Sequence, residues 1–299
     1  VRMMGATLMI HGTEEQRLQH LPPVAKGEVQ WCQGYSEPES GSDLASLDTR
    51  AVRDGDEFVI NGSKIWTSMG HRGDWIMVLT RTDTDAPKHR GISFFLVDMK
   101  TPGVQVRPII NMAGRHDFNQ IIFDDVRVPA SNIVGEENRG WYVAVTLLDF
   151  ERSGIDYSAS ARRLLDDVRE YANEVKQNGK PLMQLPWVRN AMADRYIDCE
   201  VARLIAYNVA YMQGEGLVPN KEASMSKVFG SETVQRVTQT CLDVLGMYGA
   251  LGSGETKWAK LQGRVQENWM FAFSHTIAAG TSEIQRGIIA SRGLGLPRG

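Results

Sequence analysis

The chain has 299 residues, of which 42% are hydrophobic and 23% charged, with 33 basic side chains against 36 acidic ones. This composition excludes a disordered protein, and the balanced charge without a block of Lys or Arg excludes a binding surface for nucleic acid or an anionic membrane. The length predicts two domains, because single domains commonly hold ~100 to 200 residues.

The cysteines and histidines indicate a reducing compartment and no metal site. Cys32, Cys199 and Cys241 are odd in number and far apart, which fits neither a disulfide framework nor a CxxC site. The histidines show no metal-ligand spacing. No apolar run approaches the ~18 residues of a membrane span, and the N-terminus lacks the pattern of a signal peptide. We therefore expect a cytoplasmic protein without a metal site or membrane insertion.

Residues 1–26 have the pattern of a helical region, which begins at Val1 without an initiator Met. We expect them to be the end of an N-terminal helical domain that is largely missing from this chain. From residue 27 to 130, short apolar runs alternate with turn signals such as Asp54-Gly55, Asn61-Gly62 and Pro102-Gly103. The runs predict antiparallel strands at residues 31–33, 57–60, 75–79, 92–97 and 120–123. Residues 27–130 are therefore predicted to form a central β domain.

Residues 131–299 are predicted to form a helical bundle. From residue 140 to about 175 there is no proline and apolar residues recur at helical spacing, which predicts one long helix. Two further helices are predicted at residues 197–212 and 225–245, and a fourth at residues 258–273. The chain is therefore expected to be of the α+β class, with a β domain followed by a four-helix bundle.

The most informative stretches of the β domain are residues 33–43 and 62–68. In an extended strand Trp66 and Ser68 lie on the same face, so an indole and a hydroxyl point into one site. That pair suits a flat heteroaromatic ring that needs a stacking surface and a hydrogen bond at its edge. The hydroxyls and small residues from Ser36 to Asp43 let donors approach such an edge. Each piece alone is more often a turn or a core tryptophan.

Four segments together carry a resemblance to the acyl-CoA dehydrogenase family. They are residues 36–43, 61–66, 123–129 and 280–286. The resemblance covers essentially the whole chain. It implies a central β-barrel followed by the helical bundle, FAD as the cofactor, and oxidation of an acyl-CoA thioester to the trans-2-enoyl-CoA. It also implies that electrons pass to an electron-transfer flavoprotein.

The resemblance implies roles for individual residues. Contacts to the flavin or the rest of FAD are expected from Gln33, Ser36, Trp66, Ser68, Gly246, Gly280 and Thr281. Reduced flavin gains electron density at its N1 and O2 edge, so a donor such as Ser36 would stabilise it. Contacts to the acyl-CoA are expected from Ser42, and from Asp149 and Arg152 at i and i+3 on the long helix.

The catalytic base needs its own argument, because Ala279 stands where most family members carry a Glu before the Gly-Thr pair. Removing the α-proton of a thioester needs a carboxylate whose pKa is raised by a water-poor pocket. Isovaleryl-CoA and long-chain type members carry the base on the long helix, directly before an Arg. Here that position is Glu151, which is the predicted base. Glu283 is the poorer candidate, because it lies beyond Thr281.

Oligomeric partners are expected, but the sequence leaves their kind open. In the family, an Arg in a Tyr-Ala-x-x-Arg-x-x-Phe-Gly segment neutralises the pyrophosphate of the neighbouring subunit's FAD. Here Val175 replaces that Arg, Asn178 replaces the Phe, and Asp243 stands where Gln is usual. We expect either a heteromer, in which a related subunit supplies the Arg, or a homo-oligomer that uses Lys176 or backbone donors.

Two alternative functions stay open. One is a non-catalytic or half-site partner subunit of a heteromeric acyl-CoA dehydrogenase. The other is a relative that passes electrons to oxygen, as an acyl-CoA oxidase does, or acts on another acyl carrier. The length, branching or steroid nature of the acyl group does not follow from the sequence, because the cavity lining is spread over several helices.

Overall fold

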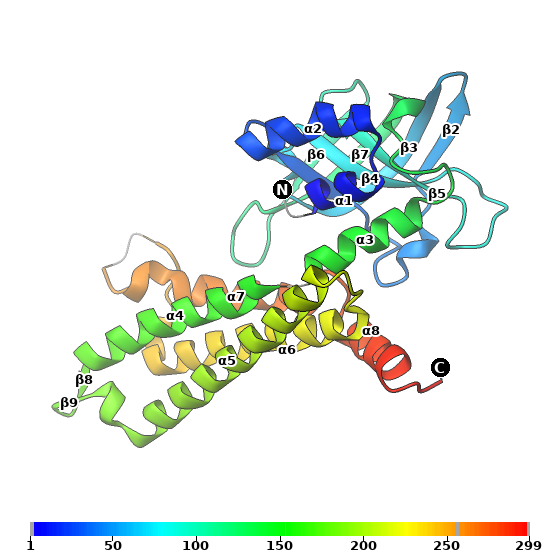
Figure 1. Ribbon diagram of the computed structural model, residues 1–299. Helices are drawn as coiled ribbons and strands as arrows, with labels where there is room; N and C mark the ends of the chain where they lie inside the picture. The colour runs from blue at the N-terminus through cyan, green and yellow to red at the C-terminus, as the bar shows by residue number, and fades with distance from the viewer. Residues whose placement is uncertain (1–2, 153, 255–256, 298–299) are drawn as a thin grey trace. The chain divides into compact units, whose positions relative to one another are not determined.

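The computed structural model describes residues 3–152, 154–254 and 257–297, and for residues 149–152 the backbone alone. Its contacts divide the chain into two compact units, residues 1–151 and 152–299. The first unit holds the large sheet with helices α1, α2 and α3, and the second holds the remaining helices (Figure 1). Each unit has a buried core of its own.

The first unit is built on a seven-stranded sheet. Its strands are β1 (Trp31–Gly34), β2 (Arg50–Asp54), β3 (Glu57–Ser68), β4 (Trp75–Arg81), β5 (Ile92–Asp98), β6 (Val104–Ile109) and β7 (Phe118–Pro129). The paired strands follow the order β1-β4-β2-β3-β7-β6, with β5 paired to β4. The longer ladders are antiparallel, whereas β1 and β4 are parallel, because the β2–β3 hairpin separates them in the chain. The pairing of the strands does not close on itself among the described residues, and the sheet is a curled half-barrel.

Two cores lie on opposite faces of this sheet. Strands β4 and β5 send alternate side chains to each face, as the two-residue period of a strand requires. Met77 and Leu79 of β4 join one core, whereas Ile76 and Val78 join the other. Because both faces are covered, the two strands are buried along nearly their whole length.

Three helices pack on the sheet: α1 (Met4–His11), α2 (Glu14–Lys26) and α3 (Gly140–Arg152). Helix α2 begins with a capping box, in which Thr13 and Gln16 exchange hydrogen bonds between side chain and backbone. The same Gln16 amide donates to the carbonyls of Ser131 and Ile133, each at 2.8 Å. These bonds attach α2 to the segment that follows β7. Helices α1 and α3 bury their apolar residues in one core with β4 and β5.

The second unit is a bundle of α4 (Ile155–Glu174), α5 (Pro186–Gly214), α6 (Asn220–Leu245) and α7 (Arg264–His275), followed by the short α8 (Ser282–Ile288). A small hairpin, β8 (Lys176–Gln177) and β9 (Lys180–Pro181), joins α4 to α5. Helical spacing directs one apolar stripe of each long helix to a common core. Leu165, Val168, Val237 and Cys241 are fully buried there.

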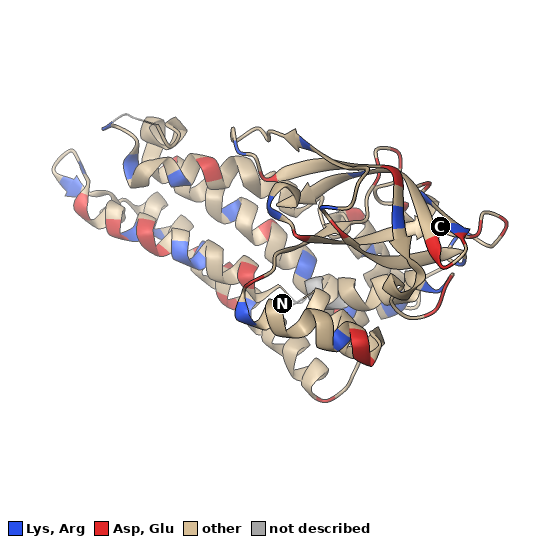
Figure 2. Ribbon diagram, turned by 90° about the horizontal axis from the view of Figure 1, so that it is seen from above, with Lys and Arg blue, Asp and Glu red and all other residues tan. Residues whose placement is uncertain are grey.

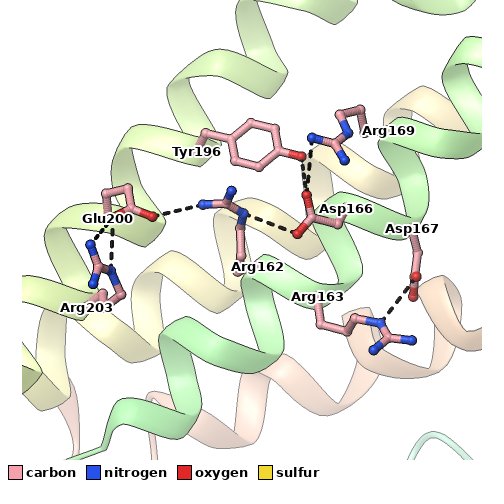
Figure 3. A network of polar contacts seen from close by, with 8 residues as sticks. All are labelled: Arg162, Arg163, Asp166, Asp167, Arg169, Tyr196, Glu200 and Arg203. Atoms are coloured by element: carbon pink, nitrogen blue, oxygen red, sulfur yellow. Dashed lines mark hydrogen bonds and ion pairs between the residues drawn. The ribbon is translucent and has the colours of Figure 1, made fainter.

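Charged side chains connect α4 to α5 (Figure 3). Arg162 binds Asp166 at 3.2 Å and Glu200 of α5 at 2.9 Å, and the Tyr196 hydroxyl donates to Asp166 at 2.6 Å. Burial, and then the hydrogen bond to Asp166, raises the pKa of Tyr196 to about 12. Partly exposed ion pairs contribute little stability each. The network therefore links the two helices but adds little to the stability of the bundle, which rests on the shared apolar core.

Basic and acidic residues are intermixed along the chain in both units (Figure 2). On α4, for example, Arg162 pairs with Asp166 and Arg163 with Asp167, one turn further along the helix. Among the described residues, no helix combines the length and apolar character that crossing a bilayer requires.

The predicted α+β class is confirmed, and the structure corrects four details of the prediction. Strand β1, which was predicted to be antiparallel, pairs with β4 in parallel. The single helix predicted over residues 140–175 is two helices, because the chain turns at Gly154, whose φ of 15° and ψ of 55° leave the helical region. The fourth bundle helix begins at Arg264 rather than at Trp258, since Leu261 and Gln262 have left-handed φ angles of 50° and 58°. Asn61-Gly62, predicted as a turn, lies inside β3 at a shift of register against β7.

Candidate functional site

The end of strand β3 presents an indole and a hydroxyl on its exposed side. Trp66 is 57% exposed and Ser68 is also exposed, while Thr67 between them is buried. A β-bulge produces this arrangement, because residues 65 and 66 of β3 together face the single residue 120 of β7. Trp66 adopts a left-handed φ of 62°, a strained conformation for a bulky side chain.

Ser36 lies directly beside this strand end. Its carbonyl accepts a hydrogen bond from the Ile65 amide at 2.8 Å, so Ser36 and Trp66 are neighbours in space. Both Ser36 and Gln33 of β1 are half-buried. The structure thus brings the predicted ring contacts Ser36, Trp66 and Ser68 to adjacent segments of the first unit.

Behind Ser36 lies a buried ion pair that the sequence analysis did not predict. Lys64 is fully buried, and its Nζ lies 2.7 Å from Oε1 of Glu37, which is 8% exposed. Burial alone would raise the pKa of Glu37, but the Lys64 ammonium and hydrogen bonds from Thr49 and Asp48 hold that pKa below its ordinary value. Burial lowers the pKa of Lys64 to about 8 against the attraction of Glu37. The signal that could have identified Lys64 is its inward position in the alternating pattern of β3.

A second polar cluster beside the bulge was also not predicted. The amide of the buried Asn119 donates from Nδ2 to the carbonyl of Thr67 at 3.1 Å, and its Oδ1 lies 2.7 Å from Nε2 of His116. Because the Thr67 carbonyl can only accept, the Nδ2 group of Asn119 must face it. The Oδ1 of Asn119 then faces His116 and can only accept, so this hydrogen bond requires a proton on Nε2 of His116. His71 stacks on His116 with the ring centroids 3.9 Å apart. Asn119 therefore anchors the backbone between Trp66 and Ser68.

The second unit carries a polar pocket of ≈ 440 Å³. Residues from α6, α8 and the segment between α7 and α8 line it: Glu232, Gln235, Arg236, Thr276, Ile277, Thr281, Ser282, Glu283 and Arg286. Thr281 is the N-cap of α8, and its hydroxyl accepts from the Ile284 amide at 3.2 Å. The buried Ser282 hydroxyl has no hydrogen-bond partner among the described residues. Because most of its lining side chains are polar or charged, the pocket suits a polar ligand.

Two glycines that were predicted to contact the cofactor have backbone conformations that favour glycine. Gly280 has a φ of 88° directly before Thr281, and Gly246 has a φ of 57° at the end of α6. Glu283 is exposed on α8, and hydrogen bonds from its own amide and from the Thr281 hydroxyl hold its pKa below the usual value. A base for an α-proton needs the opposite shift.

The predicted substrate contacts are placed only in part. Ser42 lies in an exposed loop, next to Asp43, whose carboxylate binds Lys88. Asp149, Glu151 and Arg152 lie on α3, and their side chains fall outside the described residues. Their roles therefore stay predictions. No group of three or more His, Cys, Asp or Glu that could hold a metal occurs in the part of the chain that the structure describes.

Comparison with known proteins identifies the family. The acyl-CoA dehydrogenase middle domain matches residues 32–126, and the acyl-CoA dehydrogenase C-terminal domain matches residues 138–294. Acyl-CoA dehydrogenase IpdE1 of Mycobacterium tuberculosis is 37% identical, over 99% of this chain and 74% of that protein. The chain belongs to the acyl-CoA dehydrogenase family.

Solved structures of acyl-CoA dehydrogenases share the fold at similar identity. The Tcur3481–Tcur3483 steroid ACAD is 38% identical with a TM-score of 0.92, over 100% of this chain and 76% of that one. The ChsE4–ChsE5 complex from Mycobacterium tuberculosis is 38% identical with a TM-score of 0.91, over 100% and 77% of the two chains. The family predicted from the four sequence segments is confirmed, and with it the class of enzyme, a flavin-dependent oxidoreductase.

Proposed function

We propose that this acyl-CoA dehydrogenase binds FAD, oxidises the Cα–Cβ bond of an acyl-CoA to the trans-2-enoyl-CoA, and passes the electrons to an electron-transfer flavoprotein. The observation that carries the proposal is the exposed indole of Trp66 beside Ser36 and Ser68. Ser36 and Trp66 lie on segments by which the chain resembles its family, and Ser68 follows two residues after Trp66. A strained, exposed tryptophan is unfavourable for folding, and use as a stacking surface gives a physical reason for it.

The residues of the first unit fit a flat, polar-edged ring. Trp66 would stack against it, while Ser36, Ser68 and Gln33 would form hydrogen bonds at its edge. The chemistry that FAD supplies when bound is acceptance of a hydride equivalent from the substrate. Donors that are already fixed in place stabilise the developing charge without reorganisation.

In the second unit, Thr281, Gly280 and Gly246 would hold the remainder of the cofactor. This part of the proposal is supported by the polar pocket that Thr281 lines. The left-handed backbone at both glycines gives a ligand close access to main-chain atoms.

On the substrate side, Glu151 is proposed to remove the α-proton, while Asp149 and Arg152 order the acyl cavity and Ser42 contacts the acyl-CoA. Ala279 offers no carboxylate at the other position that the family uses. The lowered pKa of Glu283 disfavours it as an alternative base.

The partner is proposed to be a related subunit rather than a second copy. Val175 and Asn178 do not supply the cation and aromatic ring of the family segment. Asp243 is exposed and accepts a hydrogen bond from Gln239 at 2.9 Å, so a carboxylate stands where an amide is usual. The relative ChsE4–ChsE5 is a complex of two differently named chains. Because another relative is a steroid ACAD, steroid acyl-CoAs are the first substrate class to test.

Anaerobic titration of the purified full-length protein with a panel of acyl-CoAs tests the activity. The panel holds short, branched, long-chain and steroid acyl groups, and the readout is bleaching of the flavin absorbance. We expect one class to bleach the flavin, and the electron-transfer flavoprotein to restore its colour. Absence of flavin even after co-expression with a related subunit would support the non-catalytic alternative. Equally fast recovery with oxygen alone would support an oxidase.

A further inference from the structure

Two consecutive residues of β3, Lys64 and Ile65, form hydrogen bonds with the segment that carries Ser36. The Nζ of Lys64 donates to the carbonyl of Tyr35 at 3.1 Å and to Oε1 of Glu37 at 2.7 Å. These acceptors belong to the residues immediately before and after Ser36. The next residue of the strand, Ile65, donates its amide to the Ser36 carbonyl at 2.8 Å. Three successive residues are thus held by β3: Tyr35 and Ser36 through their backbone carbonyls, and Glu37 through its carboxylate.

Glu37 extends this anchor to a second turn of the chain. Its Oε2 accepts from the Asp48 amide at 2.7 Å and its Oε1 from the Thr49 amide at 2.9 Å. The Glu37 backbone also exchanges two hydrogen bonds with Ser40, at 3.0 and 3.1 Å, which close the turn that follows Ser36. One carboxylate therefore joins the Ser36 loop, the Asp48–Thr49 segment and strand β3.

Close packing restricts movement of the three segments that Glu37 and Lys64 join. A Cβ placed on Gly62 would lie 2.7 Å from the Cα of Thr49, and one on Gly34 would lie 3.2 Å from the Cγ of Lys64. The stem of Lys64 therefore fills the space beside β1, and the strand that carries Lys64 touches the segment that Glu37 holds. Displacement of one member is therefore expected to move the others, because close-packed interiors transmit small shifts.

Stability alone is a weak reason for this ion pair. Burying two charges costs desolvation energy, and apolar residues of similar volume often stabilise a core as well or better. An apolar pair, however, could not bond the Tyr35 carbonyl or the Asp48 and Thr49 amides. The specific gain from Lys64 and Glu37 is therefore the position of the loop.

We propose that Lys64 is a positioning residue that acts through Ser36, holding that serine where it donates to the polar edge of the flavin. The inference rests on the function proposed above. A hydroxyl donor stabilises developing charge only when it is already aimed at the acceptor. Without the Lys64 contacts, Ser36 still has a hydroxyl that can donate, but its position relative to Trp66 is no longer fixed. Trp66 follows Ile65, whose amide donates to the Ser36 carbonyl.

A double-mutant cycle tests the proposal in the flavin-loaded protein, with its partner subunit where one is needed for flavin retention. The variants are Lys64→Met, Ser36→Ala and the combination, and the readouts are the dissociation constant of FAD and the flavin absorption spectrum. We expect Ser36→Ala to weaken FAD binding about tenfold, and Lys64→Met at least as much. In the Lys64→Met background, Ser36→Ala should then add less than about twofold. Independent effects that multiply would overturn the proposal.

Amide exchange in the flavin-free protein provides a readout that does not depend on the proposed function. Lys64→Met should speed exchange of the Ile65 amide, whose acceptor is Ser36, by about tenfold or more. Ile60→Ala is the matched control, because Ile60 is buried on the same strand in the sheet core. It should lower stability yet leave the ratio of Ile65 exchange to global exchange unchanged. Equal behaviour of the two variants would contradict the positioning role.

Glu37→Gln keeps the assay decisive if Lys64→Met does not fold. The Gln side chain has the size of the carboxylate and keeps one oxygen that can accept from Lys64. It carries no charge, and it lacks the second oxygen that the backbone amides of Asp48 and Thr49 need. We expect the same shift in flavin spectrum as with Lys64→Met, only smaller, and faster exchange at Ile65. Unchanged spectrum and exchange in Glu37→Gln would refute the proposal. If the wild-type protein binds no FAD, the function proposed above fails, while the exchange data still decide whether Lys64 fixes the Ser36 backbone.

Discussion

The rings of Trp66 and Phe118 meet in a T-shaped contact, with centroids 6.2 Å apart and planes at 85°. Phe118 begins β7 and pairs with Ser68, so the contact crosses the two strands at the β-bulge. It orients the indole without covering it, because Trp66 is still 57% exposed. An aromatic ring that is held in place and left open is suited to stacking against a second ring.

Replacing this ring should weaken flavin binding. Trp66→Ala removes the stacking surface, which is worth about 0.5 to 1.5 kcal/mol beyond area burial, so we expect FAD to dissociate about tenfold more readily. Ser68→Ala removes one hydrogen bond of roughly 1 kcal/mol and should chiefly alter the flavin spectrum. Trp187→Ala is the control, since Trp187 on α5 is similarly exposed at 52%. If Trp66→Ala and Ser68→Ala both retain FAD with unaltered spectra, the ring contacts are misassigned.

Glu151 is expected to be the catalytic base. Glu151→Gln should bind FAD and acyl-CoA but lose reduction of the flavin by substrate, on the order of 10³-fold in single-turnover bleaching. Glu283→Gln is the matched control, because its carboxylate lies on α8 with a lowered pKa and should be dispensable for proton removal. Unchanged bleaching in Glu151→Gln, or a comparable loss in Glu283→Gln, would move the base elsewhere.

Local periodicity was enough to predict much of the fold. Helices α5 and α6 are long and amphipathic, so their apolar spacing identified them. The breaks at Gly154 and Gln262 could not be predicted in the same way, because each depends on backbone angles of a few residues without a proline nearby. The left-handed backbone of Trp66 is a similar case, since a bulky residue gives no sign of a positive φ.

The candidate site was predictable where the residues form a contiguous motif, and not where the contact is distant in sequence. Ser36, Trp66 and Ser68 stand in two such motifs. The pairing of Lys64 with Glu37 joins positions 27 residues apart, so the alternation along β3 can place Lys64 inward but cannot name its partner. Asn119 meets Thr67 across 52 residues, so only the register of β3 on β7 reveals that contact.

The Glu37–Lys64 pair predicts a loss of stability in acid. The pKa of Glu37 in the folded protein lies below its ordinary value of 4.5, which the unfolded chain retains. The stability that this carboxylate contributes is therefore fully present above the ordinary pKa, and is lost as the pH falls through the folded one. Urea unfolding from about pH 6 down to about pH 3 measures this loss, and Glu37→Gln should show a shallower decline. Parallel pH profiles for the two proteins would mean that Glu37 is not the group responsible.

The last prediction concerns the partner subunit. Val175 lies just after the end of α4, where the family places an arginine, and Asp243 accepts a hydrogen bond from Gln239. Because Val175 supplies no cation and Asp243 adds an anion, we expect this chain to bind the pyrophosphate of a neighbouring copy poorly. Expressed alone at full length, the protein should bind FAD poorly, and co-expression with a related subunit that carries the arginine should restore flavin and activity.

Two variants separate this heteromer from a homo-oligomer. Val175→Arg combined with Asp243→Gln should let the protein retain FAD when it is expressed alone, because it restores a bidentate cation and removes the anion. Lys176→Met tests the other arrangement, in which the exposed Lys176 of β8 neutralises the pyrophosphate. Flavin content per chain and mass by light scattering are the measurements. A fully flavinated, active homo-oligomer of the unmodified protein that loses FAD on Lys176→Met would rule the heteromer out.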